Sequence, residues 1–296
     1  MDKQPASLDF IVVGAEKCGT TWLATMLKQH PQIFLPEQKE LHYFNRKFVE
    51  FPDLKNYNFD KPIEWYLSFF KDADSEKIKG EICPSYLWDE NAAQRIFAFD
   101  PKIKIVMILR DPVERTYSAY RFYVQRGVIH QDFKHALQKF EEHLLIRSLY
   151  YEQVKRYFAL FPKQNIHVIL YEDLATDSAK VLTEVEKFLG VDQYFPPNIN
   201  ERSYVTGTVQ FSLINKLLAM TRYYTHKFHL SFLLDVSRLA GLSGWLEQLR
   251  QKNKRVEQRT EIGQLDTPNL TWLRDHFRSD VGKLEQLISR DLTLWK

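Results

Sequence analysis

A glycine-bounded loop at residues 14–21 has the composition and spacing of an anion-binding site. The loop, GAEKCGTT, follows a short β-branched run and precedes a helical stretch that ends before Pro31. Where a strand meets a helix, successive backbone N–H groups and the positive end of the helix dipole attract an anion. Lys17 places a positive side chain inside the loop. The loop therefore predicts a site for a phosphate group.

The spacing of this loop is also compatible with a nucleotide P-loop that binds ATP. Its glycines match the G-x4-G spacing of nucleotide P-loops, but Thr20 and Thr21 stand where those loops carry Lys and Ser or Thr. Asp111, after a second strand, loosely fits the aspartate that an NTPase uses for Mg²⁺. A P-loop kinase or NTPase that uses ATP and Mg²⁺ is therefore the alternative. A cysteine phosphatase is excluded, because Ala24 replaces the arginine needed six residues after Cys18.

Arg110 and Ser118 form a second candidate anion-binding pair. Arg110 follows the clearest core-strand signal, the strand expected at 104–109 with its apolar run at 105–109. Such a position points into the crevice where parallel sheets bind ligands. Ser118 lies about two turns into the helix expected from about Val113 to Gln125. Both side chains can face one phosphate, so the pair predicts a clamp for a second phosphate on the same nucleotide.

Glu40 and His42 are the candidate proton-transfer residues. They are two positions apart in a stretch, 32–44, that is expected to be extended, and alternate residues of an extended chain project to the same side. A carboxylate and an imidazole beside one crevice are suited to removing a proton from a hydroxyl or an amine. Glu40 and His42 are therefore both candidates for the general base, each with the other as its partner.

The elements that must position these residues alternate between strand and helix. Buried strands are expected at 9–14, 104–109 and 166–170, each followed by a helical pattern. This alternation predicts an α/β fold, a P-loop-like parallel sheet with helices on both faces. Helical spacing in two pieces is expected over 133–161, and a final helix is expected over 279–295. Residues 209–250 carry helical spacing only and are expected to form a C-terminal helical extension that packs on the sheet or serves as a lid or acceptor-binding wall. No repeat or linker is evident, so one domain is expected over 1–296.

Composition narrows the class of protein. The 41 Lys and Arg residues against 38 Asp and Glu give a net charge of +3, too small to indicate nucleic-acid binding. Cys18 and Cys83 have no paired spacing, which argues against a disulfide framework or a structural zinc site. No apolar run approaches the ~20 residues of a membrane span, and no signal peptide is evident. We expect a cytoplasmic protein that binds no membrane, and its oligomeric state is not indicated.

Two segments carry a family resemblance. KCGTTW at 17–22 and ILRDPVERTYSAY at 108–120 resemble the nucleotide-binding signatures of sulfotransferases that use 3′-phosphoadenylyl sulfate (PAPS), over roughly residues 10–191. The resemblance implies PAPS as co-substrate, adenosine 3′,5′-bisphosphate (PAP) as product and no metal. It assigns the 5′-phosphosulfate to Lys17, Cys18, Gly19, Thr20 and Thr21, the 3′-phosphate to Arg110 and Ser118, and a place near the adenine to Trp22.

The segment at 37–44, EQKELHYF, resembles the KE-x-H-[FY]-F segment of the heparan-sulfate-type and related bacterial sulfotransferases. In that branch the glutamate is the general base, which implies that role for Glu40. Ile82 stands where the glycan-specific enzymes often carry a lysine, in an E-K-[ST]-P-x-Y-[FL] segment. This departure disfavours a polyanionic glycan, so a glycan sulfotransferase is a further alternative.

The sequence therefore predicts in-line transfer of a sulfuryl group from PAPS to a hydroxyl or amine of a small-molecule acceptor, a reaction that would suit natural-product tailoring. Glu40 would take the proton while Lys17 stabilises charge on the leaving phosphate. Cys18 is expected at a helix N-terminus, a position that lowers thiol pKa values. We therefore expect bound nucleotide to protect Cys18 from alkylation.

Overall fold

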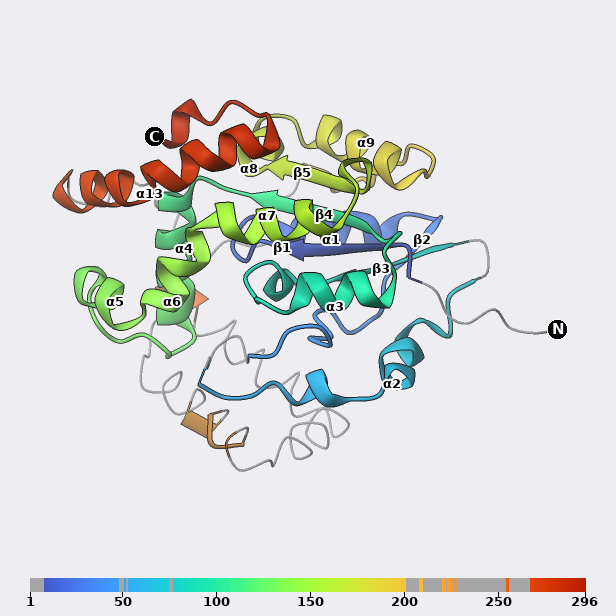
Figure 1. The fold of residues 1–296 in the computed structure, drawn as a ribbon, viewed down its shortest axis with the longest axis horizontal. Helices are drawn as coiled ribbons and strands as arrows, with labels where there is room; N and C mark the ends of the chain where they lie inside the picture. Colours follow the sequence, from blue (N-terminus) through green and yellow to red (C-terminus); the bar gives the residue numbers. More distant parts are fainter. Residues whose placement is uncertain are drawn as a thin grey trace.

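The sheet at the centre of the molecule is parallel throughout, as predicted (Figure 1). The computed structural model describes residues 8–47, 51, 53–74, 77–200, 208–209, 220–221, 223–225, 227, 254–255 and 267–296. Five strands pair in the order β2-β3-β1-β4-β5. They are β1 (Phe10–Gly14), β2 (Ile33–Phe34), β3 (Ile78–Ile82), β4 (Lys104–Leu109) and β5 (Ile166–Leu170).

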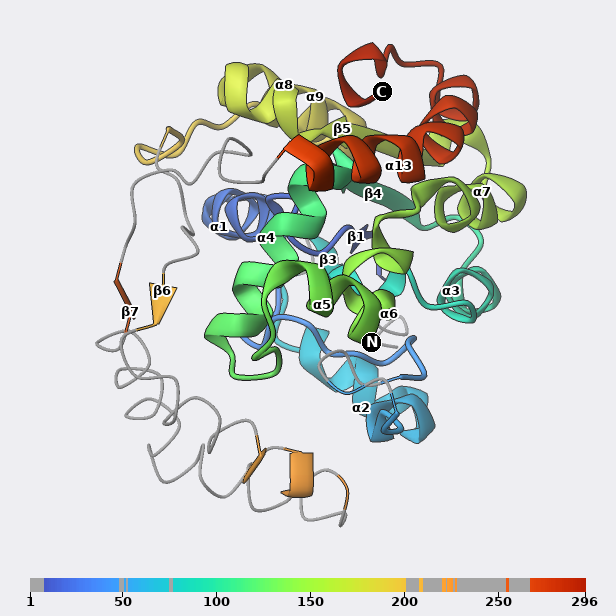
Figure 2. The same cartoon turned by 90° about the vertical axis from the view of Figure 1, so that its left-hand side faces the viewer.

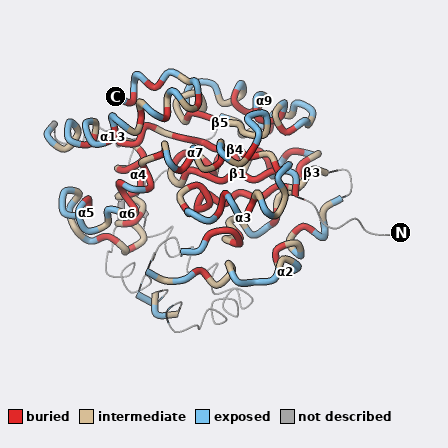
Figure 3. The backbone as a smooth tube through the Cα atoms, in the orientation of Figure 1, coloured by how far each residue is buried: buried red, intermediate tan, exposed pale blue. Residues whose placement is uncertain are grey.

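Strands β1 and β4 are apolar along their length because both faces of the sheet are covered. Every residue of β1 is buried, as is every residue of β4 after Lys104. Phe10 lies level with Gly80 of β3 and Lys104 of β4. A Cβ on Gly80 would come within 2.1 Å of the Phe10 ring, so only glycine leaves room for that ring. Figure 3 shows the resulting buried layer through the middle of the molecule.

Helices cover both faces of this sheet. In Figure 2, α1 lies on one side of the strands and both α3 and α7 lie on the other. The helices are α1 (Thr20–Gln29), α2 (Ile63–Leu67), α3 (Ala92–Phe99), α4 (Pro112–Gln125), α5 (Phe133–Lys139), α6 (Glu141–Leu144), α7 (Tyr150–Leu160), α8 (Tyr171–Thr176), α9 (Ser178–Leu189) and α13 (Thr267–Ile288). Shorter 3₁₀ segments span Tyr57–Asp60, Ser68–Phe70, Pro84–Tyr86, Ile146–Ser148, Lys163–Asn165 and Thr293–Trp295. The short strands β6 (Thr208–Val209) and β7 (Lys254–Arg255) pair with each other in antiparallel fashion.

The C-terminal helix α13 packs against both α7 and α4. It buries Leu273, Phe277 and Val281. Asp280 accepts the backbone N–H of Tyr150 at 2.8 Å, so the C-terminal helix caps the beginning of α7. None of the helices in the described parts of the chain is both long and apolar enough to span a bilayer.

Two sequence-based predictions of helix bounds differ from the structure. The helical spacing expected in two pieces over 133–161 forms more pieces, namely α5, α6, a 3₁₀ turn and α7, and the backbone leaves the helical conformation at Phe140 (φ −121°, ψ 40°). The final helix begins at Thr267 rather than Ser279, and it ends where Ser289 takes a positive φ of 55°. Most of the helical extension expected at 209–250 lies outside the described residues.

Candidate functional site

The anion-binding loop connects β1 to α1 as predicted. The Ala15 N–H donates to the Ile108 carbonyl of β4 at 2.7 Å, which ties the loop to the neighbouring strand. Gly19 caps α1 with a φ of 97°, a conformation that favours glycine. The first turn of α1 has no acidic residue and no side-chain cap. The positive end of this helix therefore faces the loop uncompensated by a side chain, as anion binding requires.

Glu16 fixes this loop to the protein core through contacts with Arg115, Arg147 and Tyr123, a role that was not predicted from the sequence. Its carboxylate lies 3.3 Å from a guanidinium nitrogen of Arg115 and 3.3 Å from one of Arg147, and it accepts the Tyr123 hydroxyl at 2.9 Å. Arg115 also donates to the Glu16 carbonyl. Burial alone would raise the pKa of Glu16, but Arg147, Arg115 and Lys17 hold it below its usual range. The loop thus rests on a buried ionic cluster.

Lys17 follows Glu16 in the loop, and its ammonium lies 4.1 Å from the centroid of the Phe122 ring. The side chain is half-buried, and burial lowers the pKa of Lys17 to about 8. The cation–π contact and Glu16 both favour the charged form of the lysine. The loop therefore contains a cation that titrates near physiological pH.

The prediction of a lowered pKa for Cys18 is wrong. Its side chain is fully buried, with Sγ 3.5 Å from the Tyr150 hydroxyl, and burial raises the pKa of the thiol to about 11. Desolvation outweighs the helix terminus because the thiolate would have to form away from water. Cys18 is therefore unsuited to alkylation at neutral pH, and the protection expected from a bound nucleotide does not follow.

Arg110 comes close to the loop through Tyr171. The Arg110 guanidinium lies 4.5 Å from the centroid of the Tyr171 ring, and a Cβ on Gly19 would be 3.2 Å from the same ring. Nε of Arg110 also donates to the Glu114 carboxylate at 2.9 Å. Ser118 lies half-buried on α4, two turns beyond Arg110. Arg110 therefore lies just before α4, and Ser118 lies in the middle of that helix.

Two further predicted residues have partners within the protein. The Trp22 indole is buried and donates to the Ile199 carbonyl at 3.0 Å. Asp111 caps α4 through the Val113 N–H at 2.8 Å, and its other oxygen lies 2.7 Å from Arg274 of α13. The carboxylate that an NTPase would use for Mg²⁺ is therefore engaged in structural contacts, which weakens that alternative.

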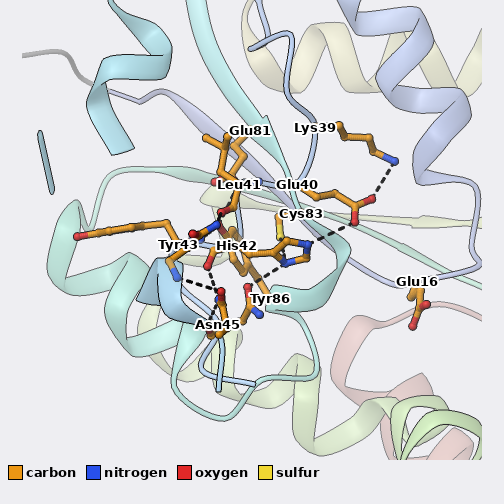
Figure 4. A network of polar contacts seen from close by, with 12 residues as sticks. Glu16, Lys39, Glu40, Leu41, His42, Tyr43, Asn45, Glu81, Cys83 and Tyr86 are labelled. Carbon is orange, nitrogen blue, oxygen red and sulfur yellow. Dashed lines mark hydrogen bonds and ion pairs between the residues drawn. The ribbon is translucent and has the colours of Figure 1, made fainter. Parts of the chain in front are cut away.

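Glu40 and His42 meet, although the chain between them is not extended. Glu40 has a φ of 63° and His42 a φ of 53°, so the expected extended backbone is wrong at both positions. The Glu40 carboxylate nevertheless lies 3.8 Å from Nε2 of His42 (Figure 4). Nδ1 of His42 lies 3.2 Å from Asn45 Oδ1 and 3.5 Å from Cys83 Sγ. These contacts orient the imidazole toward Glu40.

Glu81 of β3 holds this unusual backbone in place. Its buried carboxylate accepts the Leu41 N–H at 3.1 Å and the hydroxyls of Tyr66 and Tyr86 at 2.7 and 2.9 Å. The Tyr86 hydroxyl in turn accepts the Tyr43 N–H at 2.9 Å. Burial raises the pKa of Glu81 to about 7 against the effect of these donors. The residues that directly follow Glu40 are thus hydrogen-bonded to β3 and to the 3₁₀ segment Pro84–Tyr86.

Lys39 connects this segment to the anion-binding loop. Its ammonium lies 3.3 Å from a Glu40 carboxylate oxygen and donates to the Thr21 hydroxyl at 3.3 Å. The structure therefore brings the predicted base and the predicted phosphosulfate loop to one place. Sequence reasoning overlooked Lys39, although its position directly before Glu40 was a signal.

Comparison with known proteins identifies the family of this chain. The model of the sulfotransferase domain matches residues 7–208. Heparan sulfate glucosamine 3-O-sulfotransferase 5 of Homo sapiens is 26% identical, with 84% of this chain and 72% of that protein covered. A solved sulfotransferase from Alicyclobacillus acidocaldarius is 26% identical and superposes with a TM-score of 0.68, covering 98% of this chain and 99% of that one.

Other relatives are longer than this chain. Membrane-associated sulfotransferase kil1 of Dictyostelium discoideum is 25% identical to this chain. The match covers 70% of this chain and 62% of the length of kil1. Bifunctional heparan sulfate N-deacetylase/N-sulfotransferase 4 of Mus musculus is 31% identical over 63% of this chain, but the match spans only 22% of that protein. The domain model covers more than half of the chain, and the matched residues 7–208 include the loop, Glu40 and Arg110. The chain therefore belongs to the sulfotransferase domain family.

Proposed function

We propose that this protein transfers a sulfuryl group from PAPS to a hydroxyl or amine of a small-molecule acceptor. The observation that carries the proposal is the contact of Lys39 with both Thr21 and Glu40, at 3.3 Å each. It places a carboxylate beside the loop that would hold the phosphosulfate. A donor and a proton acceptor that face one space are what an in-line transfer needs.

The described residues fit the two anionic ends of PAPS. The loop amides at the start of α1 and Lys17 would hold the 5′-phosphosulfate, since that helix terminus lacks a side-chain cap. Arg110 and Ser118 would hold the 3′-phosphate, because Tyr171 brings Arg110 beside the loop. Trp22 would lie on the adenine side. Arginine and protonated lysine suit these roles because both are cationic donors to phosphate oxygens.

Glu40 would act as the general base in this reaction. As a lone pair of the acceptor oxygen or nitrogen forms its bond to sulfur, Glu40 takes the proton and the bond from sulfur to the 5′-phosphate oxygen breaks. Lys17 and the loop amides stabilise the charge that collects on the departing phosphate of PAP. His42, 3.8 Å from Glu40, would orient the carboxylate.

The residue at one sequence position, Ile82, favours a small-molecule acceptor over a polyanionic glycan. Ile82 is buried and apolar where the glycan-type segment carries a lysine. The named heparan sulfate relatives favour a glycan as the second candidate acceptor. A screen of phenols, alcohols and amines against N-sulfated and desulfated heparan fragments, with PAPS as donor, separates the two.

The nucleotide class is tested by calorimetric titration with PAP, and in parallel with ATP and Mg²⁺. We expect micromolar affinity for PAP without added metal and weaker binding of ATP, because Asp111 is occupied by Arg274 and the α4 cap. A preference for ATP with Mg²⁺ would refute the proposed function and favour a kinase.

Removal of Arg110 should weaken PAP binding selectively. We expect Arg110→Ala to raise the Kd for PAP about 30-fold, since a charge-assisted contact with phosphate contributes about 2 kcal/mol. Adenosine 5′-monophosphate lacks the 3′-phosphate, so its Kd should change less than about twofold. The matched control is Arg278→Ala, an exposed arginine paired with Asp275 on α13. Equal weakening of both nucleotides by Arg110→Ala would contradict the 3′-phosphate assignment.

PAP binding should also depend on the titration of Lys17. The free protein loses this ammonium as the pH rises through about 8, and a bound phosphate favours the charged form. Affinity for PAP should therefore fall by up to about tenfold per pH unit above that value, over a range where the phosphates are already ionised. Calorimetry at several pH values measures this slope. Lys17→Arg should flatten it, because the guanidinium stays protonated; an unchanged slope would exclude Lys17 as its source.

A further inference from the structure

Lys39 lies between the anion-binding loop and the candidate base Glu40. Its ammonium contacts the Thr21 hydroxyl at the start of α1 and the Glu40 carboxylate, each at 3.3 Å. Its side chain is 32% exposed and that of Glu40 is 36% exposed, so both groups can be reached from solvent. An ammonium has three donors and turns freely about its bond to carbon. Lys39 can therefore keep both partners and still donate to a third group between them.

We propose that Lys39 is a catalytic residue that donates to the oxygens of the sulfuryl group during transfer, an assignment that rests on the proposed function. Thr21 belongs to the loop that would hold the phosphosulfate, and Glu40 would face the acceptor. The sulfuryl group, which is transferred from one to the other, would therefore lie between Thr21 and Glu40. Lys17 belongs to the same loop, and its ammonium lies against the Phe122 ring. The two lysines would thus act on different atoms, with Lys17 at the leaving phosphate and Lys39 at the sulfuryl oxygens.

The charge changes of the transfer explain why a cation is useful at this point. The acceptor forms its bond to sulfur while the bond from sulfur to the phosphate oxygen breaks, and the electron pair stays on PAP. The acceptor proton passes to Glu40, so Lys39 faces a carboxylate that becomes neutral during the step. The Lys39 charge is then free to interact with the sulfuryl oxygens in the transition state, where the bonds from sulfur to the acceptor and to the phosphate oxygen are both partial.

A surface ion pair would be the simpler interpretation, and the chain contains one for comparison. Lys28 on α1 pairs with Glu37 at 2.6 Å, with 46% and 90% of the two side chains exposed. Exposed pairs of this kind contribute little to stability. Lys39 differs because it also donates to a hydroxyl of the anion-binding loop. Lys28→Met is therefore the matched control for Lys39→Met.

The test compares binding with turnover in Lys39→Met, Lys39→Arg and Lys28→Met. Turnover is measured as release of PAP from PAPS, with water or an acceptor found in the screen. We expect Lys39→Met to lower the rate constant about 100-fold while the Kd for PAP stays within about threefold, because the sulfuryl group is absent from PAP. Lys39→Arg should recover at least about tenfold of the loss, and Lys28→Met should behave as the wild type.

A second measurement does not depend on the rate of turnover. Lys39→Met should weaken binding of PAPS about tenfold more than binding of PAP, since only PAPS carries the sulfuryl oxygens. Turnover and a PAPS-to-PAP affinity ratio close to those of the wild type would overturn the assignment. A parallel loss of PAP affinity and turnover would also overturn it, because Lys39 would then act on the nucleotide. A wild-type protein that binds neither nucleotide would instead refute the proposed function, and the assignment with it.

Discussion

Glu40→Gln is expected to lower the turnover of PAPS by about 10³-fold and to leave the Kd for PAP within about twofold of the wild type. Glutamine has nearly the shape of glutamate and can still accept a hydrogen bond from Lys39, but its amide cannot take a proton from the acceptor. The carboxylate lies 3.3 Å from Lys39 and 3.8 Å from His42, so the substitution changes charge and basicity more than packing.

Paired measurements of steady-state turnover and calorimetric PAP affinity test this expectation. Glu37→Gln is the matched control, because Glu37 lies in the same segment but points to an exposed partner, Lys28. Turnover of Glu40→Gln at the wild-type rate would contradict the base assignment. His42→Gln would then be the next variant, since the imidazole is the neighbouring group able to accept the proton.

The second large effect is expected at Glu16. Glu16→Gln should lower the free energy of unfolding by about 3 kcal/mol, because it leaves the buried guanidinium groups of Arg115 and Arg147 without their carboxylate. The loop that contains Lys17 would also lose its anchor, so the affinity for PAP should fall. Urea unfolding at neutral pH gives the change in stability.

Two further variants separate the charge of Glu16 from its hydrogen bonds. Tyr123→Phe removes one donor to the carboxylate and should cost about 1 kcal/mol. Glu152→Gln is the control, since Glu152 forms an exposed pair with Lys155. The pKa of Glu16 lies below its usual range, so its stabilisation is present above the unfolded pKa of about 4.5 and is lost as the pH falls. A Glu16→Gln protein as stable as the control at neutral pH would refute the role of the ionic cluster.

The elements of the fold could be predicted because their signals are local. β1 and β4 are continuous apolar runs, since both faces of a parallel sheet are covered. The loop at 14–21 and the start of α4 could be found in the same way, because each lies where a strand ends. The beginning of α13 could not, since Pro268, Thr271 and Trp272 in its first turns are exposed, and the fully buried pattern starts only at Leu273.

The contacts that complete the site depend on residues far apart in the sequence. Arg115 and Arg147 reach Glu16 across 99 and 131 positions, and no spacing rule connects them. The positive φ angles of Glu40 and His42 depend on tertiary bonds from Glu81 and Tyr86, which override the extended backbone expected from the sequence. Cys18 shows the same limit, because its burial, which depends on the complete fold, reverses the pKa shift expected at a helix terminus.

The packing of α13 has a practical consequence for anyone who shortens this protein. The domain match ends at residue 208, but α13 lies beyond it and supplies Leu273, Phe277 and the Asp280 cap of α7 to the same core. Arg274 also reaches back to Asp111, directly after Arg110. A protein trimmed at the boundary of the family match would expose an apolar stripe on α7 and tend to aggregate. Expression boundaries for this chain should therefore be drawn from its three-dimensional packing and include residue 296.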